Sequence, residues 1–375
     1  MPRVSICVPN LNTRPFLPER FETIFNQTLQ DWELIVYDSY SDDGAWEYIQ
    51  ELAAREPRMR ISQGPREGIY PGWNACIRQA KGEYVYIATS DDTMSPDCLE
   101  KLVAALDQHP DCGVAHCCLT FIDEKSRPIL AGHCWDNWPT TLFLGEWNKK
   151  HHVRPRGHDA VVALGLKTAY YSITQILVRR SLFDEAGLFE KRWEPYGDLE
   201  WQMRAALTTK TVHIPEYLAT WRLHPQQASQ FERHVKAVRD GLYLEMANAV
   251  VQFSRNRNLP FPGGLPRRLR RFCWAEHISA YWVAETSLLE KLTVLLKSLW
   301  RNPALIMPFF QSRFRKYILR KLPDPATQVR RELHRLNLDN LSPVEPHAAK
   351  CRLPPDTPCP AAAASGLANR VKIIR

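Results

Sequence analysis

The sequence predicts an α/β domain: a mixed, mostly parallel sheet with helices on both faces. Three observations lead to this prediction. Short apolar runs alternate with helical patterns over roughly the first 230 residues, as in chains that build parallel sheets. Acidic loops follow two of these runs directly, at the place where such sheets bind ligands. The chain has 375 residues, which is enough for this domain and a smaller appendage.

Each expected strand is a short apolar run with β-branched or aromatic residues, ended by a proline or a polar turn. The strands are expected at residues 4–9, 32–37, 59–62, 83–88, 114–122 and 173–178. Apolar residues at helical spacing predict the helices between them. These helices are expected at residues 15–29, 45–55, 70–80, 96–108 and 200–207, with a helical turn at 181–187. Residues 133–170 are rich in Trp, His, Gly and Pro, which predicts a long irregular segment on the substrate side.

The charge of the chain is unevenly spread. Residues 1–230 hold 24 Lys+Arg against 30 Asp+Glu, whereas residues 231–330 hold 18 against 7. A basic back half indicates contact with an anionic surface, either phospholipid or polyphosphate. The ten cysteines include no Cys-x-x-Cys pair, so zinc spacing is excluded and reduced thiols of a cytoplasmic protein are expected. The chain opens on a strand-like run and not on a secretory signal.

Three segments are expected. Residues 1–230 form the α/β domain, residues 231–342 a helical basic appendage, and residues 343–375 a disordered tail. Basic and aromatic residues are interleaved around 267–271 and 313–321, which suits an anionic membrane surface on the inner face. A helical subdomain with a solvated basic face fits equally well. No nucleic-acid partner is expected, because no recognised module is visible.

Four groups of polar residues follow strands or begin helices. Asp91 and Asp92 follow a strand and offer oxygen ligands for Mg²⁺ or Mn²⁺, or else cap the next helix. Asp198 is a candidate general base, or else an acid favoured by a helix dipole. Arg222 and His224 alternate onto one face, where they could contact a diphosphate or a metal, although a satisfied surface His is the alternative. Asp38 follows another strand and could contact a nucleobase or ribose, or serve as a turn residue.

Together these segments resemble the family 2 glycosyltransferases of the GT-A fold. The resemblance rests on the opening Val4–Asn12, the passage Phe25–Asp38, the turn Ser41–Gly44 and the stretch Gly68–Tyr84. Their order and spacing over roughly residues 4–230 are more specific than any single motif. The sequence departs from the family pattern where an acid is common, at the following positions: Ser39, Thr89 and Gly197.

The resemblance implies a role for each matching residue. Asp198 would be the catalytic base of an inverting single displacement, with Asp91, Asp92 and His224 at a Mg²⁺ or Mn²⁺ site. The residues implied on the donor side are Pro9, Asn10, Asn12, Asp38, Arg66, Asp91 and Arg222. The implied donor is a nucleotide sugar, and the acceptor is a glycan or a lipid-linked saccharide of cell-surface polysaccharide assembly.

Two other functions remain open on the sequence. A nucleotidyltransferase would also combine a sheet edge, a metal and a nucleotide, but it usually has a Gly-rich basic loop after its first strand. Here that loop is Pro9–Thr13, which has no glycine. A non-catalytic descendant that only binds nucleotide sugars is the second alternative.

Overall fold

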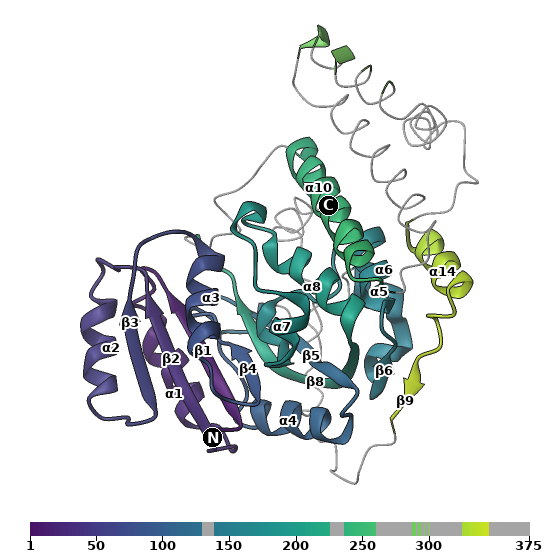
Figure 1. The fold of residues 1–375 in the computed structure, drawn as a ribbon. Helices are drawn as coiled ribbons and strands as arrows, with labels where there is room; N and C mark the ends of the chain where they lie inside the picture. Colours follow the sequence, from purple (N-terminus) through teal and green to yellow (C-terminus); the bar gives the residue numbers. More distant parts are fainter. Residues whose placement is uncertain are drawn as a thin grey trace, which may run out of the picture.

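The computed structural model describes residues 1–129, 139–225, 236–259 and 325–344, with a few positions between 287 and 300. The basic stretches at 267–271 and 313–321, and the expected tail beyond residue 344, lie outside these residues. Figure 1 shows the described part as one α/β body with its helices packed on a central sheet. No helix in the described ranges has the length and apolar character needed to cross a membrane.

The described strands form one sheet of nine strands, in the order β3-β2-β1-β4-β7-β5-β8-β6-β9. Their bounds are β1 Val4–Asn10, β2 Trp32–Asp38, β3 Met59–Gln63, β4 Tyr84–Ile87, β5 Cys112–Ile122, β6 His152–Arg154, β7 Ile176–Arg179, β8 Lys210–Arg222 and β9 Ser342–Pro343. Strands β1 to β4 run parallel, and β5 runs parallel to β8. Strand β7 is antiparallel to both β4 and β5, and β6 and β9 are also antiparallel to their neighbours. The predicted mixed, mostly parallel sheet is therefore confirmed.

Helices cover both faces of the sheet, because the central strands are apolar on both sides. In β1, for example, Val4, Ile6 and Val8 belong to one buried cluster and Cys7 to the other. The first face carries α1 Leu17–Phe25, α2 Ala45–Ala53 and α4 Cys98–Gln108. The second face carries α3 Ile69–Gln79, α5 Pro139–Leu144, α6 His158–Leu166, α7 Leu182–Ala186 and α8 Gly197–Thr208, with α10 Lys236–Asn256 and α14 Pro325–Arg335.

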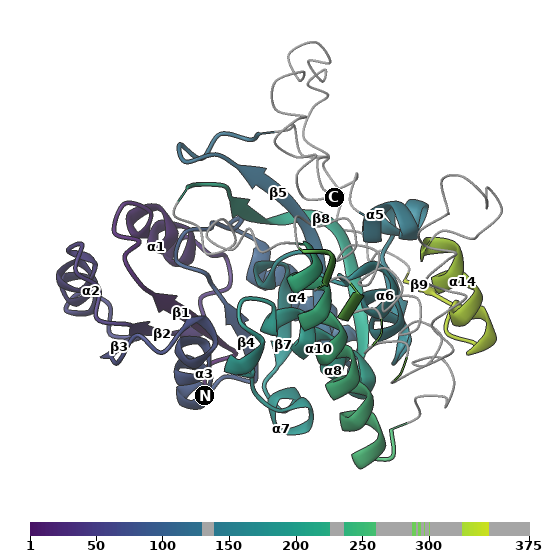
Figure 2. The same ribbon diagram turned by 90° about the horizontal axis from the view of Figure 1, so that it is seen from above.

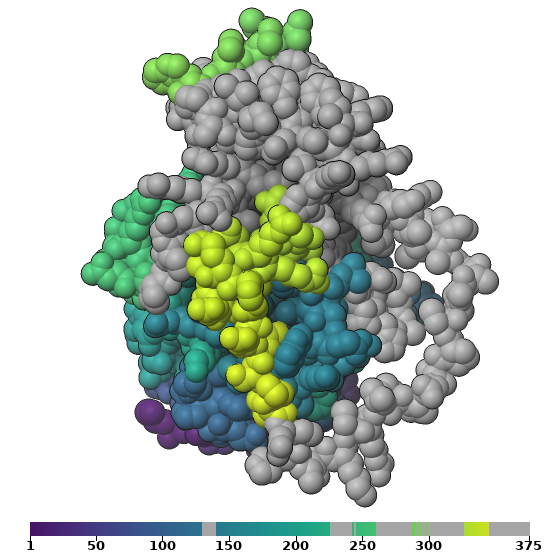
Figure 3. Space-filling view, turned by 90° about the vertical axis from the view of Figure 1, so that its right-hand side faces the viewer, coloured from purple at the N-terminus to yellow at the C-terminus, as the bar shows by residue number. Residues whose placement is uncertain are grey.

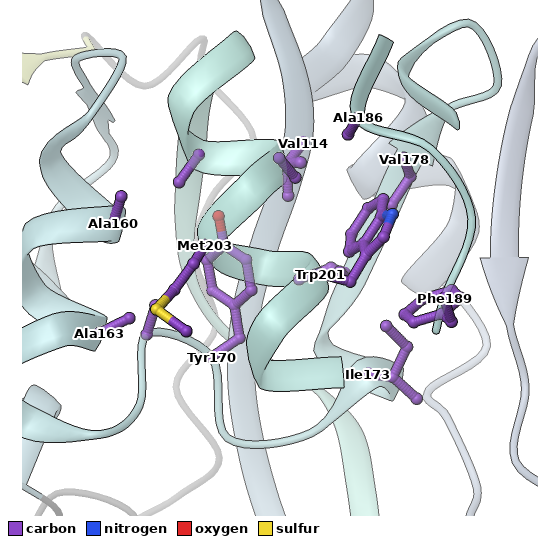
Figure 4. Close-up of a cluster of buried hydrophobic side chains, with 14 of the residues drawn as sticks. Val114, Ala160, Ala163, Tyr170, Ile173, Val178, Ala186, Phe189, Trp201 and Met203 are labelled. Atoms are coloured by element: carbon purple, nitrogen blue, oxygen red, sulfur yellow. The ribbon is translucent and has the colours of Figure 1, made fainter. Parts of the chain in front are cut away.

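Helix α8 is central to the second face. Figure 4 shows Trp201 and Met203 pointing to opposite sides of this helix, toward Phe189 and Ala163 respectively. The rings of Trp201 and Phe189 lie 5.0 Å apart between centroids, and both are buried. Figure 2 shows α10 lying alongside α8. This packing fixes the start of α8, where Asp198 lies.

The prediction of an irregular segment at 133–170 is wrong for most of its described part. Residues 139–166 contain α5, the 3₁₀ turn η2 Gly145–Lys149, β6 and α6. Helix α6 is buried from His158 to Gly165 and apolar on nearly all sides, so it has no amphipathic period to recognise. The strand expected at 173–178 begins later, because a 3₁₀ turn, η3 Ile173–Gln175, precedes β7.

The described parts of the expected basic appendage pack on the α/β body. The Tyr243 hydroxyl of α10 donates to the carbonyl oxygen of Ala163 on α6, and Val329 of α14 is fully buried. Strand β9 extends the sheet beside β6. Figure 3 shows the segment of α14 and β9, in yellow, lying across the surface of the body. The boundary at residue 230 stays a prediction, because most of residues 260–324 lie outside the description.

Candidate active site

The loops that carry the predicted site residues share one edge of the sheet. Strands β1, β2 and β4 are parallel, and β8 runs in the same direction because β7 is antiparallel to both β4 and β5. Their carboxyl ends therefore meet at one edge, where open α/β sheets bind ligands. Helix α8 ends two residues before β8 begins, so the start of α8 lies toward that same edge. Three clusters of polar side chains lie there.

The first cluster surrounds Asp38 at the end of β2. Asp38 is fully buried, and its Oδ1 accepts hydrogen bonds from Nδ2 of Asn10 and Oγ of Ser41, both at 2.6 Å. Its Oδ2 accepts hydrogen bonds from the Ser41 backbone N–H and from Nε2 of Gln63, both at 3.0 Å. Asp38 thus organises the loop after β2, and a direct contact with a nucleobase stays a prediction.

The exposed rim of this cluster joins Asn12, Asp42 and Arg66. The Asn12 side chain donates from Nδ2 to Oδ1 of Asp42, 2.9 Å away, and accepts from the Asp42 backbone N–H. The Arg66 guanidinium donates to Oδ2 of Asp42 at 2.8 Å and to the carbonyl oxygens of Ser39 and Tyr40. Arg66 hydrogen-bonds to Asp42, and this pair lowers the pKa of the Asp42 carboxyl. The structure therefore brings Asn12 and Arg66 together, while Pro9 lies close to Gly72 on α3.

The second cluster, called here the edge cluster, consists of Asp91, Asp92, Arg222 and His224. Asp92 is buried and turned inward: Oγ1 of Thr89 donates to its Oδ2, and the Arg222 backbone N–H donates to its Oδ1 at 2.7 Å. Burial, and next the neighbouring Asp91, raise the pKa of Asp92 to about 8. In this conformation both Asp92 oxygens are used by the protein, so its role as a metal ligand stays a prediction.

Asp91 and His224 face each other at the rim. Oδ2 of Asp91 lies 3.0 Å from Nε2 of His224, whose ring packs 4.7 Å from that of Phe16. Among the described residues, no group of three or more His, Cys, Asp or Glu side chains is arranged to hold a metal ion. A carboxylate and an imidazole nevertheless suit Mn²⁺, which accepts both ligand types, and Mg²⁺ commonly takes one or two carboxylates plus substrate phosphates. The chemistry of this pair therefore fits a divalent cation shared with a diphosphate.

Arg222 holds the acidic loop in place. Its guanidinium is buried and donates to the carbonyl oxygen of Asp91, to that of Asp123 at 3.0 Å and to Oε2 of Glu19 at 2.7 Å. It also lies over the Phe16 ring. These partners tie β8 to α1 and to the loop after β4. Arg222 thus supports the loop that carries Asp91, and its direct contact with the donor stays a prediction.

The third cluster lies at the start of α8. Asp198 is half-buried, and its Oδ1 lies 3.1 Å from the Tyr70 hydroxyl of α3. Burial raises the pKa of the Asp198 carboxyl. Burial, and next the charge of Asp198, also raise the pKa of the Tyr70 phenol well above its usual value. A carboxylate with a raised pKa at a ligand-binding edge is suited to accept a proton.

Sequence reasoning missed three members of this edge. Tyr70 touches Asp198, Glu194 accepts a hydrogen bond from the Ile69 backbone N–H, and Glu19 pairs with Arg222. Each lies far along the chain from its partner, so no local motif links them. Two glycines are the sequence signal that could have pointed to these contacts. Gly68 lies against the Glu194 carboxylate, and Gly197 lies against the Tyr70 ring.

The three clusters offer different chemistry along the same edge. The edge cluster offers a carboxylate, an imidazole and a buried guanidinium close to one another, which suits an anionic leaving group. Asp198 offers a separate carboxylate that is able to accept a proton. The cluster around Asp38 shapes the loops at the far end of the same edge.

Comparison with known families gives one clear match. Residues 5–187 match the family model described as Glycosyl transferase family 2. The structure resembles that of S. aureus TarS 1-349 in complex with UDP-GlcNAc, with a TM-score of 0.58 and 15% sequence identity. This likeness covers 90% of the present chain and 92% of the other. At that identity the likeness establishes the fold.

Curated relatives match shorter parts of the chain. Chondroitin synthase of Pasteurella multocida is 35% identical over 158 residues, which is 41% of this chain and 16% of the relative. An uncharacterized glycosyltransferase of Haemophilus influenzae is 24% identical over 237 residues, or 62% of this chain and 69% of the relative. Matches to the first five relatives cover between 16% and 32% of their lengths.

Proposed function

We propose that the protein is a family 2 glycosyltransferase that transfers a sugar from a nucleoside-diphosphate sugar to an acceptor hydroxyl, because residues 5–187 match the model of that family and the structure resembles a GT-A fold. The transfer is a single displacement that inverts the anomeric carbon. The acceptor is a growing glycan or a lipid-linked saccharide of a cell-surface polysaccharide. Relatives named chondroitin synthase support the wider role in glycan synthesis.

One observation carries this proposal: two chemically different acidic groups lie at the same edge of the sheet. Asp91 pairs with His224 after β4 and β8, while Asp198 lies at the start of α8 beside Tyr70. Transfer from a nucleotide sugar needs positive charge near the departing diphosphate and a base near the acceptor. Asp91 and His224 would meet the first need by holding a divalent cation, and Asp198 would meet the second as the base.

On the donor side, Asp91 and His224 would hold a Mg²⁺ or Mn²⁺ ion, with Asp92 as a further candidate ligand. When bound, such an ion supplies positive charge beside the diphosphate. Arg222 keeps the loop of Asp91 in place through the Asp91 carbonyl oxygen, and its own charge lies below this site. Pro9, Asn10, Asn12, Asp38 and Arg66 would line the nucleoside end.

On the acceptor side, Asp198 takes the proton. As the acceptor O–H bond breaks, its electron pair forms the new bond to the anomeric carbon, and the bond from that carbon to the phosphate oxygen breaks. The nucleoside diphosphate leaves with the electrons of that bond, and the proton stays on Asp198. The raised pKa of Asp198 favours this proton uptake.

The same proposal places the enzyme on the cytoplasmic side, docked on an anionic membrane beside a lipid-linked acceptor. It rests on the basic and aromatic stretches around 267–271 and 313–321. Pelleting with vesicles of anionic phospholipid at low salt tests it. Binding to anionic vesicles but not to neutral vesicles supports docking on an anionic membrane. Absence of binding to both kinds contradicts it.

The full chain should be incubated with a panel of UDP- and GDP-linked sugars, with Mn²⁺, Mg²⁺ or EDTA, while released nucleoside diphosphate is measured. We expect release that requires a divalent ion and increases with a glycan acceptor. Asp198→Asn should lower turnover roughly 10³-fold while donor binding persists. Full turnover by Asp198→Asn would contradict the assigned base. Pyrophosphate release from a nucleoside triphosphate would instead indicate a nucleotidyltransferase, and donor binding without turnover a binding protein.

A further inference from the structure

We propose that Tyr70 is a positioning residue whose hydroxyl serves both protonation states of Asp198, donating to the carboxylate and accepting from the carboxylic acid. The inference rests on the proposed function, in which Asp198 is the base. It assigns a task to a buried tyrosine on α3, a helix that carries none of the predicted catalytic carboxylates.

The geometry around the hydroxyl gives the first argument. The Tyr70 oxygen lies 2.6 Å from the carbonyl oxygen of Pro195 and 3.1 Å from Oδ1 of Asp198. A phenol has one proton to donate, and a carbonyl oxygen can only accept. When Tyr70 donates to Pro195, its oxygen can accept a hydrogen bond only from a protonated Asp198. When Asp198 is ionised, the Tyr70 proton can turn to Oδ1.

Steric contacts fix Tyr70 in this place. A Cβ atom on Gly197, the residue before Asp198, would lie 2.7 Å from Cε2 of Tyr70. The ring thus fills the space where a side chain at position 197 would be. A larger side chain at position 197 would therefore displace the Tyr70 ring. The Tyr70 ring also stacks on Phe189, with centroids 5.8 Å apart, so its rotation is restricted.

A second contact connects the start of α3 with the segment just before α8. The Glu194 carboxylate accepts a hydrogen bond from the Ile69 backbone N–H, at the first residue of α3. A Cβ atom on Gly68 would collide with that carboxylate, and Gly68 has a φ of +118°, a region that favours glycine. Both helix starts are therefore held in register, which keeps the Tyr70 hydroxyl beside Asp198.

Few charges face Asp198, and its carboxylate is stabilised by hydrogen bonds, first from the Leu199 backbone N–H and next from the Tyr70 hydroxyl. Glu194 is engaged with α3, and Glu200 pairs with Arg204 on the buried side of α8. Lys191 and Arg192 lie in the exposed turn η4 Lys191–Trp193, where Arg192 pairs with Glu190. Burial raises the pKa of Asp198, and the Tyr70 hydrogen bond opposes this rise. Tyr70 thereby favours the ionised form of Asp198.

Over one turnover the hydroxyl would reorient once. Before transfer it donates to the ionised Asp198, which then takes the proton from the acceptor hydroxyl. The new Asp198 O–H donates to the Tyr70 oxygen, whose own proton turns to the Pro195 carbonyl oxygen. Tyr70 and Asp198 together then hold the proton taken from the acceptor, until Asp198 releases it to solvent.

The test is a ¹³C-carboxyl NMR titration of Asp198, which needs no substrate. The Asp198 signal is identified by its absence in Asp198→Asn. In Tyr70→Phe, which keeps the ring over Gly197, we expect the pKa of Asp198 to rise by about one unit, because a hydrogen bond to the charged form is lost. An unchanged titration in Tyr70→Phe would overturn the inference. If Tyr70→Phe does not fold, 3-fluorotyrosine at position 70 tests the same point with the opposite sign, because its more acidic hydroxyl should lower the pKa.

Tyr86→Phe is the matched control. Tyr86 is also fully buried and donates to a backbone carbonyl oxygen, that of Thr174 at 2.7 Å, but Asp198 is not among its partners. We expect its Asp198 titration to match that of the unchanged protein. With the donor identified by the transfer assay, Tyr70→Phe should lower kcat more at pH 6 than at pH 8 and leave KM unchanged. If Asp198→Asn loses activity but the pKa of Asp198 is unchanged in Tyr70→Phe, the inference about Tyr70 is refuted and the proposed function stands. Retained activity in Asp198→Asn would refute the proposed function instead.

Discussion

Two polar clusters of this molecule both contain histidine but lie at different positions along the strands. The edge cluster of Asp91, Asp92, Arg222 and His224 follows the ends of β4 and β8. A second group, called here the histidine stack, consists of His116, His152 and His213 on β5, β6 and β8. These three are register partners across adjacent strands, and each is at most 2% exposed.

The difference in position gives the two clusters different tasks. In the histidine stack, Nδ1 of His116 lies 2.9 Å from Nδ1 of His213, so one ring must donate and the other accept, and Nε2 of His213 lies 3.0 Å from the Asn148 carbonyl oxygen. Burial lowers the pKa of all three imidazoles. The stack is neutral and sealed within the sheet, whereas the edge cluster has Asp91 at the rim. Burial thus distinguishes the histidine stack, which lies inside the sheet, from the edge cluster, which solvent reaches at Asp91.

The largest effect on stability is expected from Arg222→Met, which would remove the buried guanidinium that supports the edge cluster. It would leave the carbonyl oxygens of Asp91 and Asp123 without their donor and Glu19 without its partner. We expect the free energy of unfolding to fall by about 3 kcal/mol, measured by urea denaturation. Arg127→Met is the control, because Arg127 pairs with Asp123 but is 71% exposed, and no resolvable change is expected. Equal losses in the two variants would contradict the role given to Arg222.

Asp91→Asn should separate ligand binding from stability. Asp91 lies at the rim, so its loss should leave the free energy of unfolding nearly unchanged. Donor affinity in the presence of Mn²⁺ should fall about 100-fold, because the carboxylate that would hold the ion is gone. Calorimetric titration with the donor, with and without Mn²⁺, measures this. An unaltered Mn²⁺-dependent affinity would mean that the edge cluster does not bind the ion.

The histidine stack should instead make stability depend on pH. The pKa of His152 is lowered by burial to about 3 in the folded protein, below the usual 6.5. The unfolded chain therefore binds more protons below pH 6.5, and stability is lost as pH falls from 6.5 toward 3. At pH 5 the lowered pKa of His152 should reduce the free energy of unfolding by about 2 kcal/mol relative to its value above pH 6.5.

His152→Gln tests this directly. Its plot of unfolding free energy against pH should be flatter than that of the unchanged protein between pH 6.5 and 4. His334→Gln is the control, since the His334 side chain is 84% exposed, and it should keep the original slope. A His152→Gln profile parallel to the original would show that this ring is already charged when folded.

The fold and the edge could be predicted because both depend on local patterns. The apolar runs of β1, β2 and β4 are contiguous, and Asp38, Asp91 and Asp92 follow them directly. The order of these elements alone places their loops at a single edge. The family model over residues 5–187 matches the same region.

The rest depends on partners far apart in sequence. His116 and His213 are separated by 97 positions, and Tyr70 and Asp198 by 128. Each histidine lies inside an apolar strand, where its neighbours give no sign of a polar partner. The inward turn of Asp92 was equally invisible, because it follows from the Thr89 hydroxyl and the backbone of Arg222. Such contacts are products of tertiary packing and leave no local period.

The smallest effect is expected at the far side of the sheet, from Val329→Ala in α14. Val329 is fully buried, and its helix leads into β9, where Pro343 is the register partner of His152. Removing two methyl groups should cost about 1.5 kcal/mol of unfolding free energy. Sugar transfer should stay unchanged at temperatures where the variant is folded, because α14 packs against α6 and not against the carboxyl ends of β4 and β8. Arg331→Ala, at an exposed position of the same helix, should change neither quantity. If Val329→Ala reduced turnover without loss of stability, the two clusters would be coupled through the sheet, and the separation between a sealed interior and an open edge would not hold.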